Sequence, residues 1–386
     1  MNVKELFNLN PEIIHLNHGS FGACPRPIFE TYQNFQTQLE RDPVSFIKEE
    51  GPALLEKSKS SLATYLHANA QDIIYVPNPT TAMNTVIKNL ELNQGDEILS
   101  TNQEYGAIEN TWEYYCNQKN AKFVKAEIPM PFNSKEEFLE VFWNSYSEKT
   151  RYVFLSHCTS TTATIFPIKE ICKKAHELGL ITIIDGAHIP GHIDFNLKTL
   201  GADIYTGALH KWLLAPKGSS FLFVTSKLQK QMDPLIVSWG YDPKKKSASY
   251  FQDYHQFNGT RDFSAYLCTP ACLKFFDDND WEDKKKECRD ILREAIPEFS
   301  DILNSGLTCP ANEQFLGQML SFPIKHDNSD ELQSLLRNKY KISIPIMTSP
   351  LGTFLRISYQ AYNKKEDLSA LNQALREIFQ EKRHAF

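Results

Sequence analysis

The residues best suited to chemistry in this chain stand at the ends of two successive apolar segments. Asp185 closes the run Ile181–Asp185, and Lys211 follows Ile204–Thr206 within the sequence TGALHKW. Because the carboxyl ends of parallel strands meet at one edge of a sheet, we expect these side chains to lie close together. A buried carboxylate needs a cationic partner, and a lysine partly removed from water becomes a nucleophile toward aldehydes.

Each of these residues also has an ordinary alternative. Asp185 is equally suited to capping the turn that follows it, and Lys211 to being a solvated surface charge. What favours a site is the coincidence of both at consecutive strand ends, with hydroxyl groups nearby. Cys268 and Cys272 are four residues apart, but no matching Cys/His pair accompanies them, so we expect no metal site.

An alternation of short apolar runs and helical stretches between about residues 70 and 225 would position these residues. It predicts an α/β fold with a mostly parallel sheet covered by helices. Runs such as LITIID and YVFLS are apolar throughout, as expected for strands buried on both faces. The predicted strands are Ile73–Val76, Glu97–Ser100, Lys122–Ile128, Arg151–Ser156, Ile181–Asp185, Ile204–Thr206 and Ser220–Val224. The predicted helices are Thr81–Leu90, Ala107–Gln118, Lys135–Tyr146 and Ile168–Leu178.

A change of texture after about residue 280 predicts a second, smaller domain of the α+β type. Its expected elements are a charged helix at Trp281–Glu294, strands near Gln318–Pro323, Ile342–Ile346 and Thr353–Ser358, and a last helix from Lys364. We therefore predict an N-terminal arm at 1–49 that packs with the small domain, a large domain at 50–280 and a small domain at 281–386.

Composition excludes several classes of protein. The 386 residues carry 41 Lys and Arg against 47 Asp and Glu, a net charge of −6, so the basic excess of a nucleic-acid-binding protein is missing. No apolar stretch approaches the roughly 18 residues of a membrane span, and the N-terminus lacks the apolar run of a secretory signal. The eight scattered cysteines are expected to be reduced thiols. We expect a cytoplasmic protein.

The longest informative stretch, DGAH…LGADIYTGALHKW…PKGSSFLFV, resembles the class V aminotransferase family, and within it the isopenicillin N epimerase-like branch. HLNHGSFGACP, YVPNPTTAMNTV, EYGAIENTW, LSHCTSTTATIFPI, NGTRD and FLRISYQAYN support the resemblance in the same order along residues 15 to 363. The resemblance implies pyridoxal 5′-phosphate as cofactor and the fold type I of such transferases. That fold has a large domain built on a mostly parallel seven-stranded sheet, with a smaller α+β C-terminal domain.

The resemblance also assigns roles around the cofactor ring. Lys211 would form the Schiff base and then move the proton of the substrate α-carbon. Asp185 would pair with the protonated pyridine nitrogen, and His188 would lie against the phenolic oxygen. Tyr105 is the expected ring on the open face of the cofactor.

Phosphate binding and dimerisation follow from the same resemblance. Thr80 and Thr81 open a predicted helix, where free N–H groups and the helix dipole favour an anion. Thr206 and His210 would add donors. Gly259 and Thr260 resemble a loop contributed by the partner subunit, which implies a homodimer with shared sites.

For the substrate, an amino acid, Arg356 corresponds to the family's carboxylate-binding arginine, whose planar fork suits a carboxylate. Asn17 and His18 would line the substrate pocket, and His18 is a hypothetical second acid/base group. The chain contains no G-x-G-x-x-G, G-x-x-x-x-G-K-[ST] or G-x-S-x-G motif, which argues against nucleotide-dependent and hydrolase alternatives.

The reaction itself is decided outside the core of the site. Cysteine desulfurases of the family need a nucleophilic cysteine shortly before the carboxylate-binding arginine, and Ile346–Leu355 contains none. An epimerase or a C–S or other β-lyase therefore ranks first, followed by an aminotransferase. A non-catalytic homologue ranks last.

Overall fold

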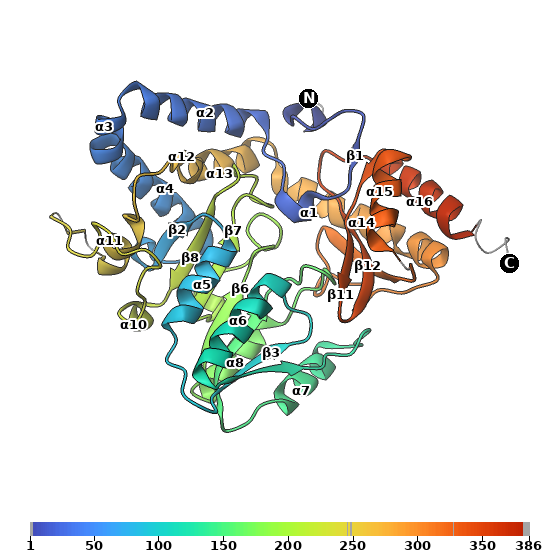
Figure 1. The fold of residues 1–386 in the computed structure, drawn as a ribbon. Helices are drawn as coiled ribbons and strands as arrows, with labels where there is room; N and C mark the ends of the chain where they lie inside the picture. The colour runs from blue at the N-terminus through green and yellow to red at the C-terminus, as the bar shows by residue number, and fades with distance from the viewer. Residues whose placement is uncertain (1–2, 245, 248, 327, 381–386) are drawn as a thin grey trace.

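The computed structural model describes residues 3–244, 246–247, 249–326 and 328–380, and its centre is a seven-stranded sheet (Figure 1). The strand order is β2-β8-β7-β6-β5-β3-β4, and β8 alone runs antiparallel to its neighbours. The bounds are β2 (Ile73–Val76), β3 (Glu97–Thr101), β4 (Lys122–Ala126), β5 (Thr150–Ser156), β6 (Ile181–Asp185), β7 (Ile204–Ala208) and β8 (Ser220–Val224). The predicted mostly parallel α/β sheet is confirmed, with all seven strands in place.

Both faces of this sheet are buried, which explains the continuous apolar runs. Ile183 and Ile184 in β6 are fully buried but belong to different hydrophobic clusters, because successive side chains of a strand point to opposite faces. The Ile183 face packs on α5 (Pro79–Asn89) and α6 (Gly106–Lys119). The Ile184 face packs on a set that includes α4 (Gly51–Leu66), α7 (Lys135–Asn144), α8 (Ile168–Glu177) and α13 (Thr269–Asp278).

The C-terminal part forms its own antiparallel sheet in the order β11-β12-β9, made of β9 (Met319–Ile324), β11 (Ile346–Ser349) and β12 (Gly352–Ser358). Its helices are α14 (Trp281–Leu303), α15 (Ser329–Asn338) and α16 (Lys365–Gln380). The predicted strand Ile342–Ile346 is wrong as one element. It divides into β10 (Ile342–Ser343) and β11, because Pro345 between them has no N–H for a strand ladder. The charged helix also runs past Glu294, since buried Phe299 and Ile302 continue its apolar stripe.

The N-terminal segment joins both parts of the molecule. β1 (Ile14–His15) pairs in parallel with β10, so residues near the start of the chain lie beside the C-terminal elements. The next helix of appreciable length, α2 (Arg26–Arg41), contacts α12 (Ser264–Leu267) and α13 on the other side (Figure 1). Between them lies the short helix α1 (His18–Phe21), which passes the edge of the large sheet. Of the helices in the described ranges, none has the length and apolar character needed to cross a membrane.

Candidate active site

A cavity of about 350 Å³ opens where the parallel strands end, and both Asp185 and Lys211 border it. The juxtaposition expected from the two strand ends is therefore present. Ser156 at the end of β5 pairs with Asp185 in the sheet, so β5 and β6 form one rim. The polar and aromatic residues lining the cavity are Ser20, Phe21, Asn78, Thr80, Tyr105, Ser156, Cys158, Ser160, Asp185, His188, His210, Lys211 and Lys217.

Asp185 is a buried carboxylate with spare hydrogen-bonding capacity. Its side chain is only 4% exposed, and the backbone N–H of Ala187 donates to Oδ1 over 2.9 Å. Burial raises the pKa of the Asp185 carboxyl, while that N–H and the charge of Lys211 act in the opposite direction. Among the described residues no other group donates to Asp185, so its second oxygen is available to a protonated ring nitrogen.

Lys211 is held as a weakly basic amine. Burial and the charge of Arg356 lower the pKa of Lys211 to about 8, against the opposing effect of Asp185. Its Nζ lies 3.1 Å from Nε2 of His188, which itself is 2% exposed. A pKa near neutrality leaves a useful fraction of the amine unprotonated, as a nucleophile or base requires.

The N-terminus of α5 is capped by Asn78. Asn78 Oδ1 accepts from both N–H and Oγ1 of Thr81, at 2.8 and 3.0 Å. Pro79 occupies the first helical position, where its missing N–H costs nothing, and this sets the cap one residue before it. Thr80 lines the cavity, whereas Thr81 is engaged by the cap.

Two further residues expected near the phosphate differ in their availability. Thr206 donates its hydroxyl to the carbonyl of Phe221 over 2.7 Å, is fully buried and does not line the cavity. His210 does line it, and its Nδ1 donates to the carbonyl of Ser219 over 3.0 Å. Burial lowers the pKa of His210 to about 4, so the ring is neutral and its Nε2 accepts hydrogen bonds. An anion bound nearby would raise that pKa and favour the protonated ring.

Arg356 in β12 is a buried cation without a carboxylate. It is 1% exposed, its Nη1 donates to the carbonyl of Ser160 over 2.7 Å, and its Nη2 donates to Oγ of Ser20 over 2.8 Å. Within the described ranges its Nε finds no partner and no acidic side chain forms an ion pair with it. Burial lowers the pKa of Arg356 to about 10. A charged group this deep needs an anion, and a substrate carboxylate would supply one.

Asn17 and His18 lie behind the cavity and do not line it. Asn17 Oδ1 accepts from Oγ of Ser20 over 2.5 Å, so Asn17 supports the serine that holds Arg356. His18 is fully buried, with Nε2 donating to the carbonyl of Lys211 and Nδ1 facing the hydroxyl of Tyr362, both at 3.1 Å. Both of its nitrogens are thus engaged by the protein, which leaves His18 to orient the Lys211 backbone.

Tyr105 stands at the mouth of the cavity, 46% exposed, immediately before α6. The preceding Glu104 points inward, where it accepts from Oγ1 of Thr101 and the N–H of Ser156, each at 2.7 Å. Burial raises the pKa of Glu104 to about 7. Glu104 thereby ties the Tyr105 segment to the strand end beside Asp185.

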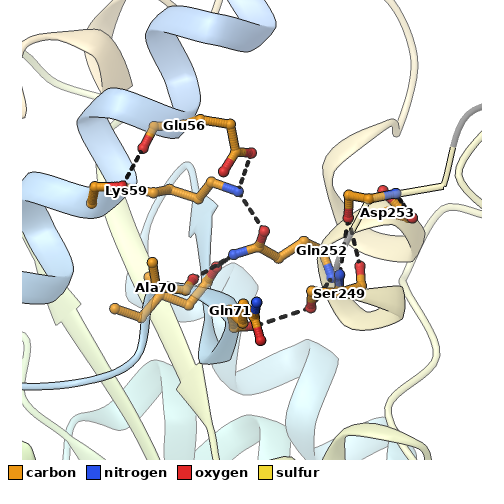
Figure 2. Close-up of polar contacts among 10 residues, drawn as sticks. Glu56, Lys59, Ala70, Gln71, Ser249, Gln252 and Asp253 are labelled. Atoms are coloured by element: carbon orange, nitrogen blue, oxygen red, sulfur yellow. Dashed lines mark hydrogen bonds and ion pairs between the residues drawn. The ribbon is translucent and has the colours of Figure 1, made fainter.

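Gly259 and Thr260 are not brought to this cavity within the chain. They are exposed and border a second, separate cavity of about 410 Å³ together with Phe257 and Phe263. The loop that carries them follows α11 (Tyr250–Gln256), whose Gln252 is held by contacts with Lys59 and Ala70 (Figure 2). Gln252 Oε1 accepts from the buried Lys59 over 2.6 Å, and its Nε2 donates to the carbonyls of Ala70 and Ile73.

The donor set around the first cavity fits pyridoxal phosphate. A carboxylate with a spare oxygen, a weakly basic amine and a helix N-terminus at Thr80 converge on one space. These are the three groups that a protonated pyridine, an aldehyde and a phosphate respectively require. Two residues that contact the site, Ser20 and Trp212, were not predicted from the sequence, although both stand in motifs quoted above. Ser20 accepts a hydrogen bond from Arg356 and Trp212 donates one to His188, and local sequence patterns do not show such contacts.

Comparison with known proteins agrees with this geometry. Residues 23–371 match the family model described as Aminotransferase class-V. Isopenicillin N epimerase of Streptomyces clavuligerus is 30% identical over 95% of each chain, and a probable chloroplastic L-cysteine desulfhydrase of Arabidopsis thaliana is 28% identical over 96% of this chain and 84% of its own. The apo cysteine desulfurase of Thermococcus onnurineus NA1 superposes with a TM-score of 0.84 at 17% identity, covering 98% of each chain. A family model that spans most of the chain, on a fold and site of this kind, shows that the chain belongs to the class V aminotransferase family.

Proposed function

We propose that this protein is a pyridoxal-phosphate-dependent enzyme that removes the α-proton of an amino acid. The observation that carries the proposal is the buried, unpaired guanidinium of Arg356 behind a cavity that also presents Lys211 and Asp185. These groups offer one place each for a carboxylate, an amine-reactive aldehyde and a ring nitrogen. The family is pyridoxal-phosphate-dependent, which supports this cofactor.

The chain's own residues would divide the work as follows. When bound, pyridoxal phosphate takes up the electron pair released at the substrate α-carbon. Asp185 would hold the ring nitrogen and Thr80 the phosphate, while Lys211 would hold the aldehyde and later act as the base. Arg356 would hold the substrate carboxylate, braced by Ser20 and by the carbonyl of Ser160.

We infer β-elimination, as in a C–S or other β-lyase, as the reaction. It needs a single base at the α-carbon, and Lys211 lines the cavity with a pKa that burial lowers to about 8. Persulfide formation of the desulfurase kind is disfavoured, since the segment from Ile346 to Leu355 contains no cysteine. Epimerisation is the second candidate, because an epimerase is among the full-length relatives. It requires another base, and His18, with both nitrogens engaged, does not provide it.

We further propose a homodimer in which Gly259 and Thr260 reach the phosphate site of the partner. Within one chain they border a different cavity from Lys211, and Gly259 has a φ of +106° that places the loop in a conformation favouring glycine. The segment that leads into this loop carries several exposed apolar side chains, as expected for a surface that a partner covers. They are Leu235, Ile236, Val237, Trp239, Tyr241, Tyr250 and Phe257.

Absorbance spectroscopy followed by product analysis tests the reaction. The purified protein should show a visible cofactor band that Lys211→Ala lacks. With a panel of L-amino acids, ammonia and a keto acid mean elimination, whereas the D-enantiomer with solvent deuterium at the α-carbon means epimerisation. Conversion of the cofactor to its amine form would mean transamination. Protein that stays colourless with added pyridoxal phosphate would overturn the proposal.

Subunit complementation tests the shared site. Lys211→Ala damages the cavity on its own chain, whereas Gly259→Val damages the loop that would serve the partner. If sites are shared, mixing the two inactive variants assembles one intact site per mixed dimer and restores activity. No recovery, with sedimentation showing mixed dimers, would contradict shared sites.

A further inference from the structure

His188 has a partner inside the protein for each of its ring nitrogens. Nε2 lies 3.1 Å from Nζ of Lys211, and Nδ1 accepts from the indole Nε1 of Trp212 over 3.4 Å. The imidazole and the indole are both buried, at 2% and 0% exposure.

Elementary donor chemistry fixes which nitrogen of His188 carries the proton. An indole N–H donates and never accepts, so Nδ1 must offer a lone pair to it. In a neutral imidazole the single proton then sits on Nε2. The opposite tautomer would set two N–H groups against each other in a buried space, at the cost of an unsatisfied donor.

The ring is neutral in this environment. Burial lowers the pKa of His188 well below its usual range. The charged and titratable groups around His188 act in the same direction, and they are Lys211, Arg356, His192 and His210.

Trp212 is itself held in place by two other histidines. Its indole stacks on His192, with ring centroids 4.2 Å apart and planes 13° apart, and lies 4.8 Å from the ring of His18. His192 is locked too, since its Nε2 accepts from the N–H of Gln318 over 2.6 Å and its Nδ1 donates to the carbonyl of His188 over 2.8 Å. The orientation of the indole is thus tied to the turn after β6 and to the segment before β9.

We propose that Trp212 is a positioning residue that keeps His188 in the Nε2–H form, aimed as a hydrogen-bond donor at the reactive side of the cavity. In the chain alone and above pH 8, where most of the Lys211 amine is unprotonated, that donor meets the lone pair of this amine. With cofactor bound, it would be presented to the phenolic oxygen of the ring, and this part rests on the proposed function. A donor fixed before binding needs no rearrangement when the negative charge on that oxygen has to be stabilised.

Nitrogen NMR of the cofactor-free full chain, labelled with ¹⁵N-histidine, tests the tautomer without any assay. The His188 signals are identified by their loss in His188→Gln. At pH 9, where most of the Lys211 amine is unprotonated, we expect the Nδ1 resonance far downfield, as for a nitrogen without hydrogen, and the Nε2 resonance upfield with a directly bonded proton. The reverse pattern in the unmodified chain would overturn the proposal, whatever the variants do.

Trp212→Phe tests the cause, because phenylalanine keeps a ring between His192 and His18 but has no N–H. The two His188 nitrogens should move toward averaged shifts, since neither tautomer is then excluded. With cofactor and substrate, turnover should fall about ten- to a hundredfold, the usual cost of removing an orienting partner of a functional histidine. Trp281→Phe is the matched control, because this indole in α14 is equally buried but, among the described residues, its N–H has no hydrogen-bond partner. Unchanged His188 shifts in Trp212→Phe would refute the assignment, while an inactive chain with the expected shifts would count only against the proposed reaction.

Discussion

Lys59 and Lys211 both hold their amines away from bulk water, and their surroundings differ. Lys59 in α4 is fully buried, and its Nζ contacts Oε1 of Glu56 and Oε1 of Gln252, each at 2.6 Å (Figure 2). Among the described residues, Nζ of Lys211 has a hydrogen-bond partner only in Nε2 of His188, at 3.1 Å, and Lys211 faces an open cavity. Burial lowers the pKa of both amines. A lowered pKa therefore does not by itself identify a reactive lysine. Lys211 differs from Lys59 because its amine has fewer hydrogen-bond partners and borders a cavity that a ligand could fill.

Glu104 and Arg356, two other buried ionisable residues, also differ in how fully their hydrogen-bonding groups are used. Glu104 is satisfied by Thr101 and Ser156, so it belongs with Lys59 in holding the framework. Arg356 keeps an unpartnered Nε and meets no carboxylate in the described part of the chain, so it belongs with Lys211. We infer that saturated buried charges here serve the fold and unsaturated ones serve ligands.

Replacing Lys211 should give the largest effect on chemistry and a negligible effect on folding. In Lys211→Ala we expect a loss of at least about 10⁴-fold in kcat, because both covalent and acid/base roles disappear. The melting temperature of the cofactor-free chain should hold or rise, since a poorly paired buried amine is removed. Steady-state kinetics and calorimetry measure the two. If Lys211→Ala unfolds but keeps its turnover per folded molecule, Lys211 serves stability and not catalysis, as proposed here for Lys59.

Arg356→Lys comes next in size. The lysine keeps the charge but loses the planar fork held by Ser20 and Ser160, so the substrate carboxylate should bind less well. We expect kcat/KM to fall by roughly 30- to 5000-fold, corresponding to about 2 to 5 kcal/mol for a broken buried charge pair. The effect should vanish for an amine substrate that lacks the carboxylate. An equal loss with that substrate would mean that Arg356 shapes the site without binding the carboxylate.

The sequence predicted the elements with a strong apolar pattern and not those whose buried faces are polar. Asp185 and Lys211 were predictable because strands buried on both faces carry a strong apolar signal, which fixed β2, β6 and β8 to the residue. The helix α4 escaped prediction because polar Ser58 and Lys59 occupy its buried face and interrupt the apolar period.

Hydrogen bonds between residues far apart in the chain could not be predicted from local sequence patterns. His18 reaches the carbonyl of Lys211 across 193 positions of sequence, and Arg356 reaches Ser20 across 336. Local patterns show that such residues are polar but not which partners they meet. The hydrogen-bonding state of His18, which excludes it as a free base, is accordingly a property of the fold alone.

Lys59→Met tests the framework side of the comparison. Methionine fills similar volume but leaves the buried Oε1 of Gln252 without its donor, whereas the exposed Glu56 returns to water. We expect a loss of about 1 to 3 kcal/mol in unfolding free energy, as for one orphaned buried acceptor. Denaturant titration measures it, and Lys57→Met, an exposed lysine of the same helix, is the control. If the unfolding free energy is unchanged and kcat falls strongly, Lys59 serves catalysis and not stability.

Glu104→Gln should have the smallest effect, visible as a change in pH dependence. Burial raises the pKa of Glu104 from 4.5 to about 7 in the folded chain. The folded state then binds its proton more tightly than the unfolded state, so this group's contribution to stability is present below pH 4.5 and is lost as pH rises toward 7. Between pH 6 and pH 7 the loss amounts to about 1 kcal/mol. Glutamine can still accept from the N–H of Ser156 and donate to Thr101, so it keeps both contacts without titrating. Unfolding free energies measured at the two pH values should therefore differ by about 1 kcal/mol less in the variant than in the parent, and identical pH slopes would mean that Glu104 is ionised in the fold.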